Sequence, residues 1–494
     1  MERFTIPRSH VEKAAGFRRR VKPSDELKID EQTFRDLEIF EAQSGPSLFE
    51  QFVRTRTTGG TKVLQARWRR PLSTVARITA VHDSIRHILA HEKAFNMLPG
   101  DSVVMSIEHY LYSGLPVAEG GNRVERFLQA LEARVENFRS YWKMVTGVQR
   151  AAQLIRSLQT MVDNPDLQNV PGELGERLQR ARELLDRPAF RTLPTDAVEE
   201  YPFWKLAPLD QRLRDEERVT IEELLRIVFE IDALLSIAIA VRDLHLVIPE
   251  VHDGPTTFEG LGIRHPFIEK PVPNPLRVDQ EQRLLFVTGP NMAGKTTYLR
   301  ACGVAIYLAH LGMGVPAKAF SFTPCDDMFS AIGLSDSIRA GISFFQAEAL
   351  RLKAIAQSLA DGRRIVALLD EPFMGTNVKD AHDASLGILS RLAEREGSVF
   401  IVSSHLVELG EPLEQTGNVG CWRFEALEKE DGLEFDYAIR RGISTQRLGV
   451  RVLRDQGVFA LLDSPPAPPA PPAPAAPAAP APPAETATGS PASG

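Results

Sequence analysis

Cysteine is scarce in this chain, with three among 494 residues, at Cys302, Cys325 and Cys421. They lie far apart in the sequence and none forms a C-x-x-C pair, which argues against a disulfide framework or a cysteine zinc site. Such a low count suits a reducing compartment, so we expect a cytoplasmic protein.

Long apolar runs and an excess of positive charge are also missing. The longest uncharged apolar stretch, residues 301–317, is short for a membrane span. The first residues lack the apolar segment of a signal peptide, and we expect no membrane association. With 58 Lys and Arg against 65 Asp and Glu, the formal net charge is −7. Any contact with nucleic acid must therefore be local or enclosed.

The pattern along the chain predicts four segments. Residues 1–23 form a basic leader, and residues 464–494, with 12 prolines, form a disordered Pro/Ala-rich tail. Residues 24–250 read as a helical domain, with apolar stripes at helical spacing over 124–145 and over 224–241. Between these stripes, residues 164–208 read as shorter helices and loops.

From residue 251 to residue 463 the pattern changes to an α/β domain. Glycine and proline become frequent, and short apolar runs alternate with helical segments. The predicted strands are Leu284–Thr288, Ile365–Leu369 and Val399–Val402. Strands that alternate with helices indicate a parallel sheet.

Residues 289–296 carry the clearest chemical signal. They read G-P-N-M-A-G-K-T and fit the G-x-x-x-x-G-K-[ST] phosphate-loop pattern, between a predicted strand and a helix. The loop's backbone amides and the following helix would surround phosphate oxygens, Lys295 would reach the β- and γ-phosphates, and Thr296 would hold Mg²⁺. The predicted nucleotide-binding residues are Gly289, Pro290, Asn291, Met292, Ala293, Gly294, Lys295, Thr296 and Thr297. We expect the helix to continue through residues 301–317, buried against the sheet.

Two further candidates follow at strand ends. Asp370 and Glu371 end the second predicted strand, where Asp370 would reach the metal with Thr296. Glu371 would act as general base for attack on the γ-phosphate, or would orient the attacking water. His405 ends the third strand, at the sheet edge where ligands bind, and is a candidate sensor of the γ-phosphate or the water.

These motifs resemble the MutS family of DNA mismatch-repair ATPases. The resemblance is dense from Arg264 to Gly449 and detectable from Leu27. It includes Thr288–Arg300, the segment from Phe329 to Glu348, Asp370–Asn377 with Asp380, and Ser404–Leu409. Thr57-x-x-Gly60 resembles a landmark of the family's helical core.

The resemblance implies an ABC-type P-loop ATPase domain preceded by an all-α lever domain. It implies ATP and Mg²⁺ as cofactors and a dimer, here a homodimer, in which Ser343 approaches the partner's γ-phosphate. DNA is the expected partner, with a repair protein as a possible further one. Because the resemblance begins at Leu27, we expect no mismatch-reading domains. The single Phe-x-Glu, at residues 267–269, lies inside the ATPase motifs and cannot be a mismatch wedge.

Three functions fit this sequence. The first is a dimeric ATPase that couples its nucleotide state to branched, joint or damaged DNA. The second is an ATPase that acts on a protein partner without a direct DNA role, and the third is a scaffold that binds ATP but barely hydrolyses it. The intact Lys295, Asp370, Glu371 and His405 disfavour the third.

One local feature bears on the choice between the first two functions. Residues 52–70, called the basic segment below, hold six Lys or Arg and no acid. The segment would contact DNA phosphates or form a solvated helix face.

Overall fold

The computed structural model describes residues 25–113, 138–191, 193, 203–333, 344–373, 375, 377–429, 432–446 and 448–463. Ser343, the predicted leader and the predicted tail lie outside these residues, as does most of the 124–145 stripe. The chain divides into two compact units, Met1–Gln446 and Arg447–Gly494.

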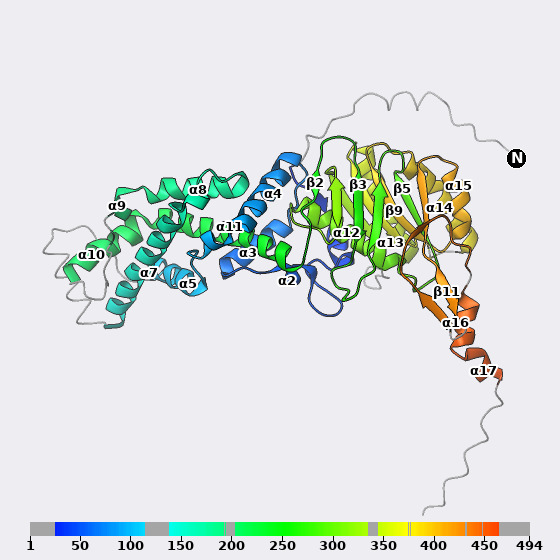
Figure 1. Ribbon diagram of the computed structural model, residues 1–494, viewed down its shortest axis with the longest axis horizontal. Coiled ribbons are helices and arrows are strands. Elements are labelled where there is room, and N and C mark those ends of the chain that lie inside the picture. The colour runs from blue at the N-terminus through cyan, green and yellow to red at the C-terminus, as the bar shows by residue number, and fades with distance from the viewer. Residues whose placement is uncertain are drawn as a thin grey trace, which may run out of the picture. The chain divides into compact units, whose positions relative to one another are not determined.

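The first unit contains a seven-stranded sheet with the order β1-β7-β8-β9-β5-β10-β13 (Figure 1). Every neighbouring pair is parallel except β10–β13. The strands are β1 (Lys28–Ile29), β5 (Leu284–Thr288), β7 (Asp327–Ala331), β8 (Ile365–Asp370), β9 (Val399–Ser404), β10 (Val419–Arg423) and β13 (Arg440–Arg441). The three strands predicted from the sequence are confirmed as β5, β8 and β9, which lie side by side at the centre.

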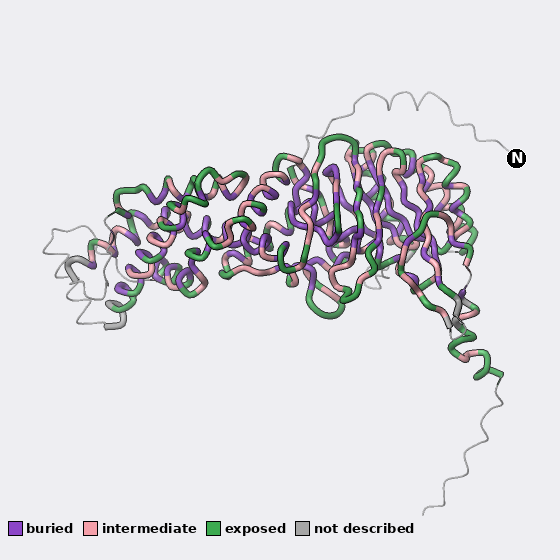
Figure 2. Tube along the Cα trace, viewed as in Figure 1, coloured by how far each residue is buried: buried purple, intermediate pink, exposed green. Residues whose placement is uncertain are grey.

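Helices cover both faces of this sheet, because alternate residues of each buried strand point to opposite sides. On one face, Leu285 and Val366 pack in the same apolar cluster as α12 (Lys295–His310). On the other face, Phe286 and Ala367 pack with helices from farther along the chain. These are α13 (Phe344–Ala360), α14 (Val378–Ala393) and α15 (Gly410–Glu414). Both clusters are buried in Figure 2.

The run 301–317 is buried as expected, but it is not helical throughout. Helix α12 ends at His310, and Gly312 adopts a φ of +69° that turns the chain. Residues 311–317 nevertheless stay buried. The helical prediction was wrong for this half of the run, because apolar composition signals burial but not helix length.

A second, four-stranded sheet packs beside α12, with the order β2-β6-β3-β4. Its strands are β2 (Glu250–Val251), β3 (Phe258–Ile263), β4 (Asn274–Val278) and β6 (Ala319–Phe322). A separate hairpin joins β11 (Ala426–Lys429) to β12 (Gly432–Phe435). Strand β4 and the residues that follow this hairpin both reach the nucleotide site described below.

The described residues between 25 and 250 are mainly helical. The described helices include α1 (Glu31–Asp36), α2 (Leu48–Phe52), α3 (Thr58–Trp68), α4 (Val75–Ala90), α5 (Asp101–Leu111), α7 (Phe138–Val162), α8 (Gly172–Leu185), α9 (Pro188–Arg191), α10 (Phe203–Gln211) and α11 (Arg218–Asp243). The exception is at the start, where β1 pairs with β7 and makes the first residues of this region part of the large sheet. This pairing depends on a distant strand, so helical periodicity could not reveal it.

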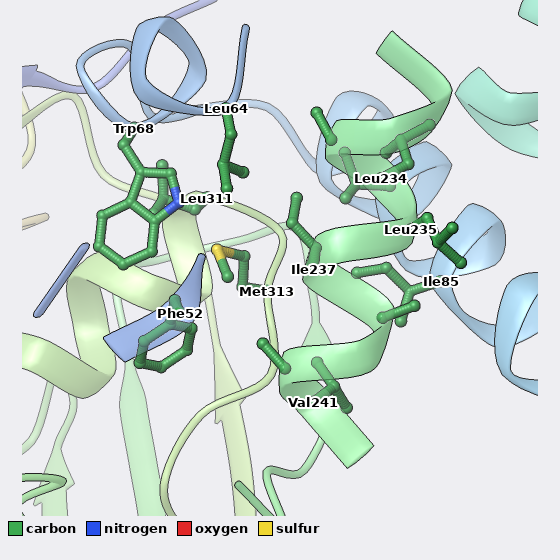
Figure 3. Packing of buried hydrophobic residues seen from close by; sticks show 14 of the residues in the cluster. Phe52, Leu64, Trp68, Ile85, Leu234, Leu235, Ile237, Val241, Leu311 and Met313 are labelled. Atoms are coloured by element: carbon green, nitrogen blue, oxygen red, sulfur yellow. The ribbon is translucent and has the colours of Figure 1, made fainter. Parts of the chain in front are cut away.

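Helix α11 is the axis of this region and packs against α3, α4 and α8. Its predicted stripe, residues 224–241, is buried. Figure 3 shows Ile237 of α11 close to Met313, which follows α12, and Leu234, Val241 and Leu311 belong to the same buried cluster. The helical region and the region of the large sheet therefore share one apolar core.

The Thr57-x-x-Gly60 landmark has a packing explanation. Asp232 of α11 is fully buried and accepts hydrogen bonds from the amides of Arg56 and Thr57, both at 2.9 Å. A Cβ on Gly60 would lie 2.2 Å from the Asp232 carboxylate, so only glycine fits there. The motif thus joins α3 to α11.

The second unit contains α16 (Gly449–Asp455) and α17 (Val458–Asp463). No residue of α17 is buried. Across the described part of the whole chain, no helix is long and apolar enough to cross a membrane.

Candidate nucleotide site

The loop 289–294 connects β5, a central strand of the large sheet, to the N-terminus of α12. Gly289 and Gly294 have φ values of +149° and +103°, and Met292 has a φ of +69°. A Cβ on Gly289 would lie 2.9 Å from the Phe424 carbonyl oxygen, so a side chain does not fit. The two glycines therefore allow the tight loop that the sequence motif predicts.

Lys295 is the first residue of α12, and its side chain lies under the loop. It is only 5% exposed, and its Nζ donates a hydrogen bond to the Gly289 carbonyl at 2.9 Å. The same Nζ lies 3.3 Å from Glu371 Oε1 and 3.5 Å from Asn291 Oδ1. The lysine charge is thus placed between the loop and the end of β8.

Thr296 and Asp370 meet at the same place from α12 and β8. The Thr296 hydroxyl donates to Asp370 Oδ2 at 2.7 Å, and the Ser403 hydroxyl of β9 donates to Asp370 Oδ1. A threonine hydroxyl and a carboxylate are oxygen ligands of the kind that Mg²⁺ prefers, so these residues fit the metal predicted from the sequence. Among the described residues, no group of three or more His, Cys, Asp or Glu side chains could hold a metal by itself.

Glu371 follows β8 directly and has a φ of +49°, unusual for a residue with a side chain. Its amide donates to the Ser403 carbonyl of β9 at 3.0 Å. His405, the residue after β9, has its Nδ1 3.9 Å from Glu371 Oε2. The structure therefore brings together the loop, Lys295, Thr296, Asp370, Glu371 and His405. The geometry leaves both sequence interpretations of Glu371, general base and water orientation, in place.

Most of these residues border a cavity of about 630 Å³. Asn291, Met292, Gly294, Lys295, Thr296, Thr297, Asp370 and Glu371 all line it, as does Pro271. Gly289, Pro290, Ala293 and His405 belong to the surrounding structure but do not line the cavity.

The cavity also has a second side, part of which sequence reasoning missed. Its lining includes Ile263, His265, Ile268, Asn274, Tyr298, Phe424 and Tyr437. Asn274 of β4 holds Tyr437 in place, because its Nδ2 donates to the Tyr437 carbonyl at 2.9 Å. Tyr437 has a φ of +54°, and its position after the hairpin carried no recognisable signal. Only the fold joins it to the phosphate loop.

The uncharged ring of His265 forms part of the wall of this cavity. Burial, reinforced by the nearby Arg300 guanidinium, lowers the pKa of His265 from 6.5 to about 4. Its Nδ1 accepts a hydrogen bond from the Phe267 amide at 3.3 Å. His265 therefore contributes a neutral ring rather than a cation near neutral pH.

The basic segment does not form a free cationic surface. Arg67 pairs with Glu173 at 2.7 Å and Arg54 with Asp243 at 3.5 Å. Arg69 and Arg70 lie beside Glu31 and Glu26. Of the six predicted cations, Arg56 and Lys62 alone form no ion pair within the described structure. The segment is therefore largely neutralised by acids from elsewhere in the chain.

Part of the chain is similar to known proteins. Residues 285–460 match the family model "MutS domain V". DNA mismatch repair protein MutS from Natronomonas pharaonis is 33% identical over 242 residues, which cover 48% of this chain and 28% of that protein. MutS from Aquifex pyrophilus is 31% identical over 233 residues, covering 46% of this chain and 27% of the relative. MutS 2 from Halobacterium salinarum is 33% identical over 235 residues, covering 46% and 26%. The chain therefore aligns with little more than a quarter of each relative.

Proposed function

Because residues 285–460 match the MutS domain V model, we propose that the chain belongs to the MutS family and is an ABC-type ATPase that binds ATP with Mg²⁺, hydrolyses it and couples its nucleotide state to DNA binding. One observation carries the ATPase proposal: Lys295, Thr296, Asp370, Glu371 and His405 converge onto one site from the start of α12 and from the ends of β8 and β9. In this proposal residues 251–463 are the ATPase domain, residues 24–250 act as the lever, and the protein works in the cytoplasm.

Each side chain has a role that follows from its position. Lys295 and the loop amides neutralise the β- and γ-phosphates. Thr296 and Asp370 hold Mg²⁺, which when bound screens the charge of the phosphates. Glu371 takes a proton from the attacking water or orients that water, and His405, 3.9 Å from Glu371, senses the γ-phosphate or the water. The apolar and aromatic wall around Tyr437 accepts the nucleoside.

Nucleotide binding and hydrolysis by the full chain test the ATPase proposal. We expect Mg-ATP to bind, as measured with a fluorescent ATP analogue, and to be hydrolysed. Lys295→Ala should weaken nucleotide binding at least tenfold, because a buried charge opposite the phosphates is lost. Equal affinity of this variant and the parent would contradict the assigned phosphate site.

We also propose that the protein acts as a homodimer, in which Ser343 serves the partner's site, as the family resemblance implies. Ser343→Ala and Lys295→Ala should each inactivate a homodimer. A mixed dimer of these two single variants puts both defects in one site and leaves the other intact, so activity should return. A mixed dimer of the double variant with the parent damages both sites. Equal activity of the two mixtures, at matched heterodimer fraction, would reject the role in trans.

DNA coupling is tested by binding to duplex, mismatched and four-way DNA over a range of salt concentrations, with and without ATP. We expect binding that changes with ATP and that weakens as salt rises, since phosphate contacts release counterions. No binding to any of these DNAs at low salt would reject a direct DNA role. It would favour the second interpretation, a nucleotide-switched ATPase that acts on a protein partner.

A further inference from the structure

Glu348 of α13 is a buried acid close to the nucleotide site but outside its cavity. Its side chain is 5% exposed, and it forms no ion pair with any residue that the structure describes. Burial raises the pKa of Glu348 above its usual value. A carboxyl group is rarely left inside a protein without a cation, so its hydrogen bonds matter.

The carboxylate holds the backbone of the loop that follows β8. Glu348 Oε1 accepts a hydrogen bond from the Phe373 amide at 2.8 Å, and the Gly375 amide also bonds to the carboxylate. Oε2 is buried and has no partner among the described residues. The contact between Glu348 and the loop is therefore made by Oε1, which accepts the hydrogen bond from the Phe373 amide.

The loop needs support because its backbone is strained. Glu371 and Phe373 have φ values of +49° and +71°, in the left-handed region that side chains disfavour. Such conformations persist only where the surroundings fix them. The bond from the Glu371 amide to Ser403 fixes one end of the loop, and Glu348 fixes the other.

Helix α13 itself is held separately from Glu348. One turn later, Arg351 donates to the Ser330 carbonyl at 2.8 Å and to the Thr33 hydroxyl at 2.9 Å. Loss of the Glu348 carboxylate should therefore release the loop and leave the helix in place.

We propose that Glu348 is a positioning residue that fixes Glu371 in its catalytic orientation by holding the amides of residues 373 and 375. The proposal rests on the ATPase function proposed above. Glu348 acts through Glu371 and does not touch the nucleotide, so it should affect the hydrolysis step and not ATP binding.

Glu348→Ala tests this directly. We expect kcat to fall about 100-fold, the scale of a small misplacement of a catalytic group, while KM and the affinity for the fluorescent ATP analogue change less than about threefold. Glu348→Gln keeps a carbonyl oxygen for the loop amides and should retain kcat within about fivefold. Lys353→Ala, at an exposed position of the same helix, is the matched control. Parental kcat in Glu348→Ala, or a similar loss in both Glu348 variants, would overturn the proposal.

A double variant separates positioning from a general structural role. In single-turnover measurements, adding Glu348→Ala to Glu371→Gln should cause little further loss, because the group being positioned has already been removed. A further 100-fold loss would overturn the proposal. If Glu371→Gln alone hydrolyses ATP like the parent, the proposed role of Glu371 fails. If that variant is inactive and Glu348→Ala is fully active, only the positioning role fails.

Discussion

The nucleotide site and the basic segment both contain conspicuous cations, and the fold uses them in opposite ways. At the nucleotide site, Lys295 lies within 3.5 Å of loop oxygens and of Glu371, around an open cavity of about 630 Å³. In the basic segment, Arg67, Arg69 and Arg70 are paired with acids from other parts of the chain. The first arrangement leaves room for a ligand, whereas the second mainly joins parts of the chain.

This difference shows why a count of charges is weak evidence for a binding surface. The partners of the basic segment lie far away in the sequence, for example Glu173 for Arg67 and Asp243 for Arg54. A local window of sequence therefore shows the arginines without their acids. The phosphate loop contains its own glycines and its own lysine, so its chemistry is local.

The largest effect is expected at the nucleotide site, with Glu371→Gln. Removal of the carboxylate should slow hydrolysis about a thousandfold, within the range for loss of a general base. Nucleotide binding should persist or tighten, because Lys295 would lose its partner at 3.3 Å and become more available to phosphate. Steady-state hydrolysis and ATP-analogue binding measure the two quantities. Parental turnover would show that Glu371 is not the base.

In the region of the basic segment, the largest effect is expected for Asp232 and not for an arginine. Asp232→Ala leaves the amides of Arg56 and Thr57 buried without an acceptor, and should reduce the free energy of unfolding by about 3 kcal/mol. Denaturant unfolding measures this loss. Asp243→Asn, which removes a partly exposed ion pair with Arg54, is the control and should cost less than about 1 kcal/mol. Equal losses of unfolding free energy in the two variants would mean that the ion pairs, and not the buried Asp232 carboxylate, hold the basic segment in place.

A smaller effect, dependent on pH, is expected for His82 of α4. Burial lowers the pKa of His82 from 6.5 to about 4, with a contribution from Arg86. At a pH between these two pKa values, His82 binds a proton in the unfolded chain but not in the folded chain, so the free energy of unfolding falls as the pH drops. His82 should account for about 2 kcal/mol of the loss between pH 7.5 and pH 5.

His82→Leu removes this titration and should make the fall in stability shallower by that amount. Unfolding curves at the two pH values, for variant and parent, measure the difference. Because His82 Nε2 is buried without a partner among the described residues, the variant should remain folded at pH 7.5. An unchanged slope would show that His82 titrates normally.

The smallest effect is expected for Arg69→Gln combined with Arg70→Gln. Both arginines lie beside acids of the same chain, so they should contribute little to phosphate contact. We expect the slope of log affinity against log salt, in the DNA assay above, to stay unchanged. A slope that falls by about two would show that both cations reach DNA phosphates, and the contrast between the two regions would no longer hold.

Much of the fold was predictable. The strands β5, β8 and β9 and the buried stripe of α11 follow from apolar periodicity, which burial enforces locally. The short strand β1 and the end of α12 at His310 were not predicted. Two residues of strand have no period of their own, and β1 exists only because β7 offers an edge to pair with.

The candidate site divides in the same way. The glycine loop, Lys295, Thr296 and the Asp370–Glu371 pair could be predicted from local sequence, because each lies at a strand end or in a glycine turn whose backbone geometry is set by its neighbours. The position of Tyr437 beside the cavity, the contact of Glu348 with the Glu371 loop and the ion pairs of the basic segment are visible only in the folded chain. These contacts join residues that are far apart along the chain. Packing of the whole core brings these residues within bonding distance. The conformational preferences of a short sequence window therefore cannot predict such contacts.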